Sequence, residues 1–419
     1  MTSSATRPLS GLKVLVTNGE QRAALAIVRS LGAAGAVPYV CSRSGASLAG
    51  ASRFAEADVP IVDPIEEPDA FAESLRDIIQ RHSIECLLPV TESALRPVLK
   101  SSHLFQGVIL PFPGQDTFAA ASDKRRVMDL ATRIGVPVPR QTVLATPDAA
   151  GPYAVDLDGE LRFPLVLKPA LSVADDDGRP LGLSVRHVAN ESQLERALVE
   201  LPGAAFPVLA QERIVGPGLG IFLLRWHGRI LARFAHRRLR EKPPSGGVSV
   251  YRESIVPPPD ALKYAETLLE ALDWQGVAMV EFKRDVGSEV PYLMEINGRF
   301  WGSLQLAVDA GVDFPRLLVE ASIGRVPARL VSGRPGVRLR WLLGDFDHLL
   351  LRMRKSRAEL ALGPDAPGRL RTLASFLVPW RPGDRWEVLR PSDPLPFGRE
   401  LREWIADATS HRADAGRES

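Results

Sequence analysis

The chain is 419 residues long, 45% of them apolar and 24% charged, and its formal net charge is +2. The length predicts two or more domains and the composition is that of an ordinary globular protein; the small net charge argues against binding nucleic acid or a membrane over the whole surface. Lysine is scarce, with 8 residues against 44 arginines, so a lysine inside a motif is informative.

Three features predict the compartment. The first ten residues contain no apolar core, so we expect no signal peptide. No apolar run approaches the roughly 18 residues that span a bilayer, so we expect no membrane span. The two cysteines, Cys41 and Cys86, cannot build a disulfide framework and fit a reducing environment. We therefore expect a soluble cytoplasmic protein.

Residues 13 to 114 alternate between short apolar runs and helical patterns. Such alternation predicts βαβ units around a parallel sheet, as in a Rossmann-type half domain. The first predicted strand is followed by TNGEQR rather than by G-x-G-x-x-G, so we expect a scaffold or substrate-binding domain instead of an NAD site. The predicted strands begin near residues 13, 37, 57, 84 and 107, and the predicted helices cover 22–35 and 69–83.

A different pattern begins after residue 120. Residues 121–134 predict a helix with Ser122 or Asp123 as its N-cap. Most of the chain from 160 to 300 has the pattern of antiparallel strands joined by turns, with a few helices inserted, which indicates α+β construction.

The strongest candidate site is a predicted hairpin at residues 280–299. Its two strands flank a turn centred near Ser288, and facing residues of an antiparallel pair have a constant sum of residue numbers. This centre places Glu281 opposite Glu295, and strand alternation puts Asn297 on the same face as Glu295. Three side chains with oxygen atoms therefore converge, two of them carboxylates.

Two carboxylates that face each other across a sheet repel, and one pKa rises unless a cation lies between them. Oxygen ligands of this kind suit Mg²⁺, which completes its shell with waters and substrate phosphates. The alternative is an outer face whose charges point into solvent. The apolar neighbours Phe282, Leu293, Met294 and Ile296 favour a buried site over that alternative.

This hairpin resembles the metal-binding hairpin of the ATP-grasp superfamily in having E-F at 281–282 and M-E-I-N-G-R-F-W-G at 294–302. The family includes biotin carboxylase, the carbamoyl-phosphate synthetase large chain and many carboxylate–amine ligases. The resemblance covers roughly residues 10 to 325 and implies a fold of α/β and α+β construction. Its expected parts are a Rossmann-like pre-ATP-grasp domain (1–118), a two-lobed ATP-grasp domain (119–322, with a hinge near 208–216) and an Arg-rich C-terminal cap (323–419).

The resemblance implies roles for individual residues. Glu281, Glu295 and Asn297 match residues that hold one or two Mg²⁺ ions, with Mn²⁺ as an alternative, on the phosphates of ATP. Arg299 matches the residue that faces the transferring phosphate and the acyl-phosphate, where an arginine neutralises developing charge.

The nucleotide site is implied by four further residues. Lys168, at the end of the strand LVLK, and Lys124, in SDKRRV, match the family's phosphate-binding lysines. At the hinge, Glu212 matches a glutamate that binds the nucleotide. Ile214 matches the residue that supplies a backbone contact to adenine and apolar packing.

Two segments carry unusual charge. Acids at 175–177 stand where family members have a Gly/Ser-rich loop over the phosphates, and they would repel a triphosphate unless they face away or meet metal. Four basic residues within 236–242 precede Gly246 and Gly247, which favours an anion-binding lid with Arg238 toward the substrate carboxylate or acyl-phosphate. An ordinary solvated hairpin tip is the alternative.

The segment 325–390 carries 14 basic residues against 6 acidic ones. It contains no recognisable nucleic-acid module, and its apolar stretch at 338–354 has a helical period. We expect an amphipathic cap whose arginines lie in solvent or bind substrate, with membrane-surface association as a less favoured alternative. The isolated His103, His187 and His348 are expected to be structural or exposed, and no Cys/His cluster predicts zinc.

These features together predict an ATP-dependent carboxylate–amine ligase of the ATP-grasp type. ATP would phosphorylate a small-molecule carboxylate, and an amine would then displace phosphate. Two alternatives stay open: a bicarbonate-activating, carboxylase-like enzyme, and a non-catalytic ATP-binding regulator, which the acids at 175–177 favour. We expect no nucleic-acid partner and allow for a homodimer; the sequence names neither the carboxylate nor the amine.

Overall fold

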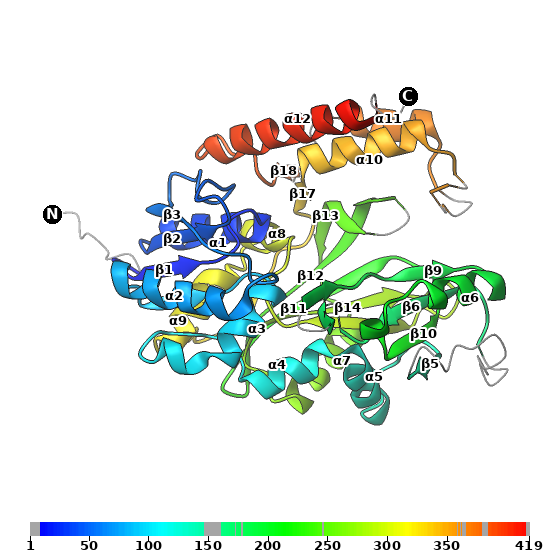
Figure 1. The fold of residues 1–419 in the computed structure, drawn as a ribbon, viewed down its shortest axis with the longest axis horizontal. Coiled ribbons are helices and arrows are strands. Elements are labelled where there is room, and N and C mark those ends of the chain that lie inside the picture. Colours follow the sequence, from blue (N-terminus) through cyan, green and yellow to red (C-terminus); the bar gives the residue numbers. More distant parts are fainter. Residues whose placement is uncertain are drawn as a thin grey trace.

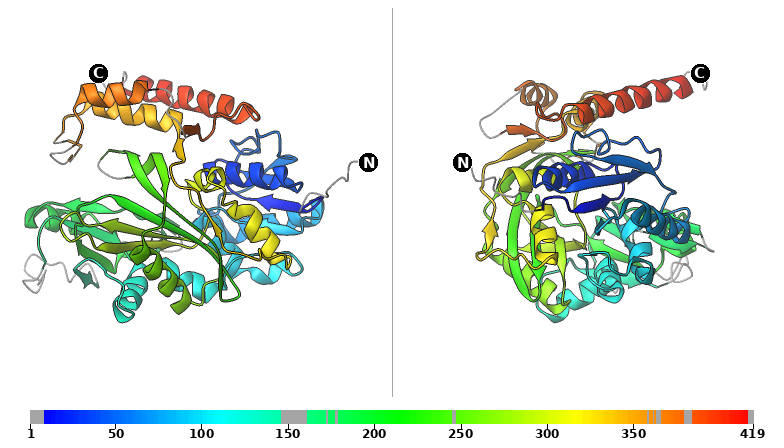
Figure 2. Two further views of the ribbon diagram at one scale, coloured as in Figure 1. Left: turned by 180° about the vertical axis from the view of Figure 1, so that it is seen from behind. Right: turned by 90° about the vertical axis from the view of Figure 1, so that its left-hand side faces the viewer.

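The computed structural model describes residues 9–145, 161–171, 173–176, 179–244, 247–357, 359–360, 362, 366–378 and 384–415. A small parallel sheet, a small antiparallel sheet and a large, mostly antiparallel sheet are each packed against helices. The helices of the C-terminal segment run across one side of the molecule (Figures 1 and 2). Within the described ranges, none of the helices combines the length and hydropathy that a bilayer-spanning helix needs.

The N-terminal part is a four-stranded parallel sheet in the order β3-β2-β1-β4, which confirms the predicted Rossmann-like arrangement. Helix α1 is buried at ten of its twelve residues because it packs both on this sheet and on α8 and α9. The strands are β1 (Lys13–Val16), β2 (Val37–Ser42), β3 (Ala57–Pro60) and β4 (Cys86–Leu88). The helices are α1 (Arg22–Ala33), α2 (Pro68–His82), α3 (Glu92–Lys100), η1 (Ser102–Phe105) and α4 (Gln115–Ser122), with α8 (Leu304–Asp309) and α9 (Phe314–Ser322) added from later in the chain.

The predicted strand at 107–114 does not form. Ile109 alone makes a β-bridge, to Cys86. Pro111 and Pro113 lack the backbone N–H that a longer ladder would need, so the segment continues as an irregular connection to α4.

The middle of the chain forms an antiparallel sheet in the order β5-β10-β6-β9, with α6 packed on β9. Asp123 caps α5 by accepting a hydrogen bond from the Arg126 amide (3.1 Å), whereas Ser122 ends α4. The elements are α5 (Lys124–Arg133), β5 (Gln141–Leu144), β6 (Leu165–Pro169), β7 (Val173–Asp176), β8 (Arg179–Gly182), β9 (Arg186–Val188), α6 (Glu191–Val199), η3 (Gly203–Ala205) and β10 (Val208–Glu212). Of the acids at 175–177, two lie in the β7–β8 hairpin, but their side chains and residue 177 are outside the described part.

The large sheet has the order β15-β14-β11-β12-β13-β17-β18, with β16 paired to β12. Its inner face shares one apolar core with α1, α7, α8 and α9. The antiparallel strands predicted between 218 and 298 are confirmed. The elements are β11 (Gly218–Trp226), β12 (Arg229–Lys242), β13 (Val248–Ile255), α7 (Pro259–Ala271), β14 (Gly276–Arg284) and β15 (Pro291–Asn297).

The C-terminal segment contains the predicted amphipathic helix, α10, and also strands that extend the large sheet. β17 pairs with β13, and β18 pairs with β17. Its arginines are not all in solvent: Arg340 and Arg352 are buried. The elements are β16 (Val331–Ser332), β17 (Arg338–Arg340), α10 (Leu342–Arg354), α11 (Arg369–Leu377), β18 (Asp384–Trp386) and α12 (Leu395–Ala415).

Candidate active site

The hairpin of β14 and β15 brings the predicted carboxylates together. Its register pairs Glu281 directly with Glu295. The Asn297 side-chain amide donates a hydrogen bond to Glu295 Oε1 (2.9 Å), so both side chains lie on one face. The Glu281 side chain is only 16% exposed, which excludes the alternative of a hairpin whose charges point into solvent.

Two arginines contact this group of oxygen atoms. Arg238, on β12, places Nη2 2.7 Å from Glu281 Oε2 and Nη1 3.0 Å from the Glu241 carboxylate. Arg299, directly after β15, donates from Nη2 to Asn297 Oδ1 (3.1 Å). Each buried carboxylate thus has a positive charge or an amide beside it, which offsets part of the cost of removing it from water.

The two facing carboxylates differ in pKa. Burial raises the pKa of Glu281, with Arg238 opposing the shift and Glu295 adding to it. Burial would also raise the pKa of Glu295, but groups that stabilise its charged form outweigh burial and lower it. These groups include Lys124, Asn297, Lys168 and Arg299. Glu295 is therefore the more readily ionised member of the pair.

Lys168 is a partly buried cation at the end of β6. Burial lowers the pKa of Lys168 to about 8, although Glu295 and Glu281 favour its charged form. A phosphate bound beside Lys168 would stabilise its charged form, because the phosphate would compensate for the lost hydration.

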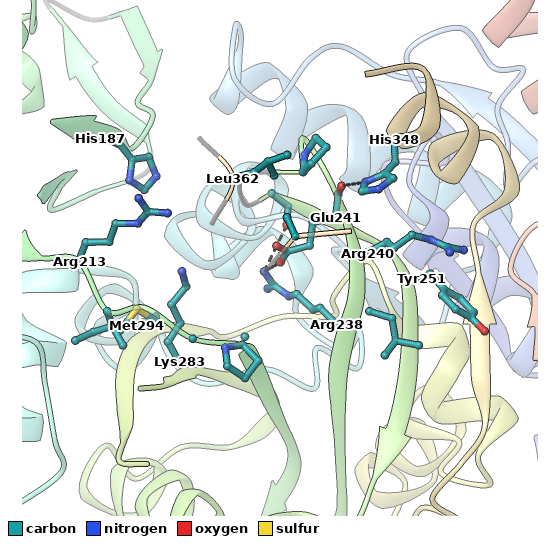
Figure 3. Close-up of a pocket in the computed structure, with 18 of the residues that line it drawn as sticks. His187, Arg213, Arg238, Arg240, Glu241, Tyr251, Lys283, Met294, His348 and Leu362 are labelled. Carbon is teal, nitrogen blue, oxygen red and sulfur yellow. Dashed lines mark hydrogen bonds and ion pairs between the residues drawn. The ribbon is translucent and has the colours of Figure 1, made fainter. Parts of the chain in front are cut away.

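A cavity of about 960 Å³ opens beside the carboxylate pair (Figure 3). Its lining carries seven arginines and lysines against four glutamates, so it favours an anionic ligand. Three predicted site residues, Lys124, Asn297 and Arg299, do not line it and instead act on Glu295 through charge or a hydrogen bond. The other six predicted residues do line it: Lys168, Glu212, Ile214, Arg238, Glu281 and Glu295.

Known proteins are similar to this chain in sequence or in fold. Residues 205–344, which contain the whole hairpin, match the family model described as ATP-grasp in the biosynthetic pathway with Ter operon. The solved L-amino acid ligase from Bacillus licheniformis is similar over 75% of this chain and 74% of that one, with 18% identity and a TM-score of 0.58. Biotin carboxylase from Campylobacter jejuni is similar over 76% of this chain and 72% of its own, with 17% identity and a TM-score of 0.60. The chain has the ATP-grasp fold.

The ATP-grasp resemblance drawn from the hairpin and the lysines is therefore confirmed. At the level of sequence, the chain is 31% identical over 128 residues to the D-alanine–D-alanine ligase of Pseudomonas entomophila (strain L48). The match covers 30% of this chain and 36% of that enzyme, so it spans about a third of the curated relative's length.

In this ATP-grasp fold the end of β10 borders the cavity. Gln211, Glu212, Arg213 and Ile214 all line it. The Glu212 carboxylate accepts a hydrogen bond from the Arg162 amide (2.9 Å). The Ile214 amide makes no hydrogen bond to any residue in the described part of the chain. Ile214 thus offers a free backbone donor next to an apolar side chain, which suits the edge of a flat heterocyclic base.

The basic residues from 236 to 242 belong to β12 itself, which corrects the expectation that they form a flexible lid. β12 pairs with β13 as far as Lys242 and Val248. Cross-strand ion pairs such as Arg237–Glu253 (2.6 Å) hold these charges within the strand. Of the two expected lid glycines, Gly247 lines the cavity, while residue 246 lies outside the described ranges.

Several cavity residues were not assigned a site role from the sequence. For Lys283 a signal existed, because lysine is rare in this chain and Lys283 lies two residues after Glu281; burial lowers its pKa. Arg213 also had a signal, because it lies between Glu212 and Ile214 at the hinge. Others, among them His187, His348, Arg352 and Arg371, come from segments far apart in the sequence, and no motif marks them.

The donor set at the hairpin fits a divalent cation that is shared with a ligand. The described residues contain no cluster of three or more His, Cys, Asp or Glu side chains that would enclose a metal ion by themselves. Glu281, Glu295 and the Asn297 amide oxygen supply fewer oxygen atoms than a closed Mg²⁺ site uses. Such a set suits Mg²⁺ that keeps its waters or takes phosphate oxygens.

Proposed function

We propose that this ATP-grasp protein is an ADP-forming carboxylate–amine ligase. A substrate carboxylate oxygen attacks the γ-phosphorus of ATP, the bond to the β-phosphate oxygen breaks, and ADP leaves an acyl-phosphate. The nitrogen of an amine then attacks the acyl carbon, loses a proton and expels inorganic phosphate. The observation that carries this proposal is the facing pair of Glu281 and Glu295, which lines a cationic cavity and has the Asn297 amide hydrogen-bonded to Glu295.

The residues divide the work by position. Lys124 and Lys168 neutralise the phosphates of ATP as point charges. Because burial destabilises the charged form of Lys168, a bound phosphate stabilises that form strongly. Glu212 and the free amide of Ile214 orient the ribose and the adenine. Mg²⁺ bound by the hairpin oxygens would neutralise charge on the phosphates during transfer.

Two arginines complete the proposed site. Arg299 stabilises the transferring phosphoryl group, since its guanidinium lies against Asn297 Oδ1 (3.1 Å). Arg238 lies between Glu281 and Glu241 and faces the cavity, where it binds the substrate carboxylate or the acyl-phosphate. Preorganised positive charge of this kind lowers the barrier because it is in place before the reaction begins.

The comparisons support the reaction class but not a particular substrate. The matched relatives are named D-alanine–D-alanine ligase and L-amino acid ligase, and both names describe the joining of a carboxylate to an amine. Biotin carboxylase shares the fold as well, so bicarbonate as the activated acid is the second candidate.

The test is ADP release from Mg-ATP in the presence of pooled amino acids and small carboxylates, with bicarbonate assayed separately. Glu295→Gln removes the charge of one metal ligand, and the glutamine side chain has nearly the same shape as the glutamate it replaces. We expect turnover to fall by at least about a thousandfold. Glu289→Gln is the matched control, because Glu289 lies exposed on the turn of the same hairpin. Persistent turnover in Glu295→Gln, with the melting temperature unchanged, would overturn the assignment of this site.

Trapping separates the remaining possibilities. Hydroxylamine added to the assay converts an acyl-phosphate to a hydroxamate, so hydroxamate formation identifies the activated carboxylate. ADP formed only with bicarbonate would favour the carboxylase-like alternative. Stabilisation by Mg-ATP without ADP under every mixture would identify a nucleotide-binding regulator instead.

A further inference from the structure

The cavity extends beyond the proposed nucleotide site to the C-terminal segment. In Figure 3, His187, Arg213 and Lys283 lie on one side, Arg238 and Glu241 in the middle, and Arg240, Tyr251 and His348 on the other. Pockets for one small ligand span about 300–1,000 Å³, so 960 Å³ is at the upper end of that range. The cavity thus continues past Arg238 to a second group of polar residues, which the C-terminal segment helps to form.

The far wall is made by one face of α10 and one face of α11. His348 and Arg352 are four residues apart on α10, and Arg371 and Ser375 are four residues apart on α11. Side chains at this spacing share a helix face, and all four line the cavity. Most of this wall lies C-terminal to residue 344, where the family match ends.

Buried ion pairs fix these helices on the large sheet. Asp345 is fully buried and bridges Arg240 (2.7 Å) and Arg340 (2.5 Å). The Arg240 guanidinium also donates to Ser375 Oγ (2.9 Å), and Arg340 donates to the Phe376 carbonyl (2.9 Å). Arg240 therefore contacts both helices, through Asp345 of α10 and Ser375 of α11.

Two other arginines of the wall form no ion pair with a carboxylate among the described residues. Arg352 is only 6% exposed, yet within the described residues its guanidinium meets just the Pro367 carbonyl. Burial, with Arg357 and Arg369 nearby, lowers its pKa. Arg371 is exposed to the cavity and makes no ion pair with any described residue. A buried arginine without a counter-charge is costly unless an anion arrives to pair with it.

Histidine adds a neutral hydrogen-bonding group to the same wall. His348 Nδ1 lies 2.6 Å from the Glu241 carbonyl oxygen and must donate to it, because a carbonyl only accepts. Burial lowers the pKa of His348, so the neutral ring leaves Nε2 as an acceptor. An acceptor beside two arginines suits a ligand that carries both an oxyanion and an N–H group.

We propose that Arg352 and Arg371 form a second anion subsite, so that one of the two joined substrates carries an additional carboxylate or phosphate group. Arginine suits this role because its planar fork binds two oxygens of either group at once. The inference rests on the proposed ligase function and specifies the substrate class of the same cavity. An acidic amino acid or a phosphorylated amino acid has the required chemistry.

Binding tests the subsite without turnover. We expect L-glutamate and O-phospho-L-serine, at millimolar concentration, to raise the melting temperature more than the matched neutral probes L-glutamine and L-serine. The larger shift of the two identifies carboxylate or phosphate as the preferred group. Arg371→Gln should remove this difference, whereas Arg402→Gln, an exposed arginine of α12 outside the cavity, should keep it. Equal shifts within each pair, or an unchanged difference in Arg371→Gln, would overturn the proposal.

Turnover separates this inference from the function on which it rests. With the anionic substrate, kcat/KM should fall about 10- to 100-fold in Arg371→Gln, while KM for ATP stays the same. A partial recovery is expected in Arg371→Lys. If ADP forms with neutral substrates alone, the ligase function stands and the subsite is wrong. If the anionic probes bind through Arg371 but no mixture yields ADP, the subsite stands and the ligase function is wrong.

Discussion

At the scale of single residues, Arg238 is the group on which the resting site depends. Its guanidinium pairs with both Glu281 and Glu241, and the pKa of Arg238 is raised because these attractions outweigh its burial. In the ligand-free protein, Arg238 therefore supplies the positive charge beside Glu281 that a bound metal ion could supply. A ligand that brings its own positive charge to Glu281 would relieve Arg238 of that contact.

Arg238→Met should lower the stability of the ligand-free protein by about 2–4 kcal/mol, because it leaves a buried carboxylate without its nearest cation. Mg²⁺ should raise the melting temperature of this variant more than that of the wild type. Arg237→Met is the control: Arg237 is half exposed, and its partner Glu253 keeps Arg338 at 2.7 Å. Equal melting temperatures for the two variants, or an equal effect of Mg²⁺ on variant and wild type, would contradict this account of Arg238.

The central residues of the site were predictable because they depend on local geometry. The turn near Ser288 and the two-residue period of a strand predicted that Glu281, Glu295 and Asn297 lie together, and they do. The direct pairing of Glu281 with Glu295 also depends on a register shift between Glu281 and Phe282, which the sequence did not reveal. The partner of Arg238 was not predictable in this way. Its contact with Glu281 crosses 43 sequence positions and depends on β11 lying between the two strands.

At the scale of elements, α12 is attached to the rest of the C-terminal segment through polar contacts. Glu400 accepts a hydrogen bond from the Trp341 indole (2.7 Å), while its second carboxylate oxygen is buried and has no hydrogen-bond partner among the described residues. The Trp404 indole donates to Asp347 (3.0 Å). Burial raises the pKa of Glu400 to about 7 from its ordinary 4.5, so α12 packs best while this side chain is protonated.

The stability should therefore depend on pH through Glu400. Between pH 4.5 and 7 the folded protein keeps a proton that the unfolded chain has lost, so stability falls as the pH rises through this window. Glu400→Gln escapes this loss and should be more stable than the wild type above pH 7, by about 1–3 kcal/mol, with no advantage at pH 4.5. Melting curves of Glu400→Gln and the wild type at pH 4.5 and pH 8 measure this difference in stability.

The control for Glu400 lies one helical turn further along α12. Glu403 is 52% exposed at its side chain and pairs with Arg399 (2.6 Å). Glu403→Gln should change the melting temperature little at either pH. A gain for Glu400→Gln that is the same at pH 4.5 and pH 8 would show that its cause is packing and not titration.

Elements with a strong period were predicted well, and elements decided by distant partners were not. The helix at 342–354 follows from its apolar spacing. Helix α3 was not predicted because Pro97 lies inside it and proline ordinarily interrupts a helix; here Thr91 caps its start (3.2 Å). β17 and β18 are three residues each, too short to show a period. They form because β17 pairs with β13 and β18 pairs with β17.

At the scale of the whole molecule, the C-terminal segment returns to the N-terminal domain. Arg29, on α1, places Nε 2.8 Å from Asp393 and donates to the carbonyls of Glu387, Val388 and Asp393. Asp393 also accepts hydrogen bonds from Ser52 Oγ and the Arg53 amide. Glu387 pairs with the buried Arg252 of the large sheet and with Arg22. These contacts join three parts of the chain.

Asp393→Ala should reduce stability by about 3–5 kcal/mol, because it leaves the Arg29 guanidinium buried with carbonyl partners alone. Urea unfolding and limited proteolysis would detect the loss, and we expect early cleavage near residues 384–395. Asp77→Ala is the control, since Asp77 forms an exposed pair with Arg76 (2.9 Å) and such pairs contribute little. Wild-type stability in Asp393→Ala would show that the carbonyls alone satisfy Arg29. This contact was not predictable from the sequence, because 364 positions separate its partners.

The pairing of β17 and β18 onto the large sheet limits how the C-terminal helices could be exchanged for those of another protein. β12, which carries Arg238, belongs to one continuous sheet with β13, β17 and β18. The helices α10 and α11, which wall the far half of the cavity, are held on this sheet by Arg240 of β12 through Asp345 and Ser375. Transplanting residues 342–378 alone from a relative would separate Asp345 and Ser375 from Arg240. A change of substrate preference that keeps these contacts would therefore use point changes on the cavity faces of α10 and α11, or exchange of the whole block from β12 onward.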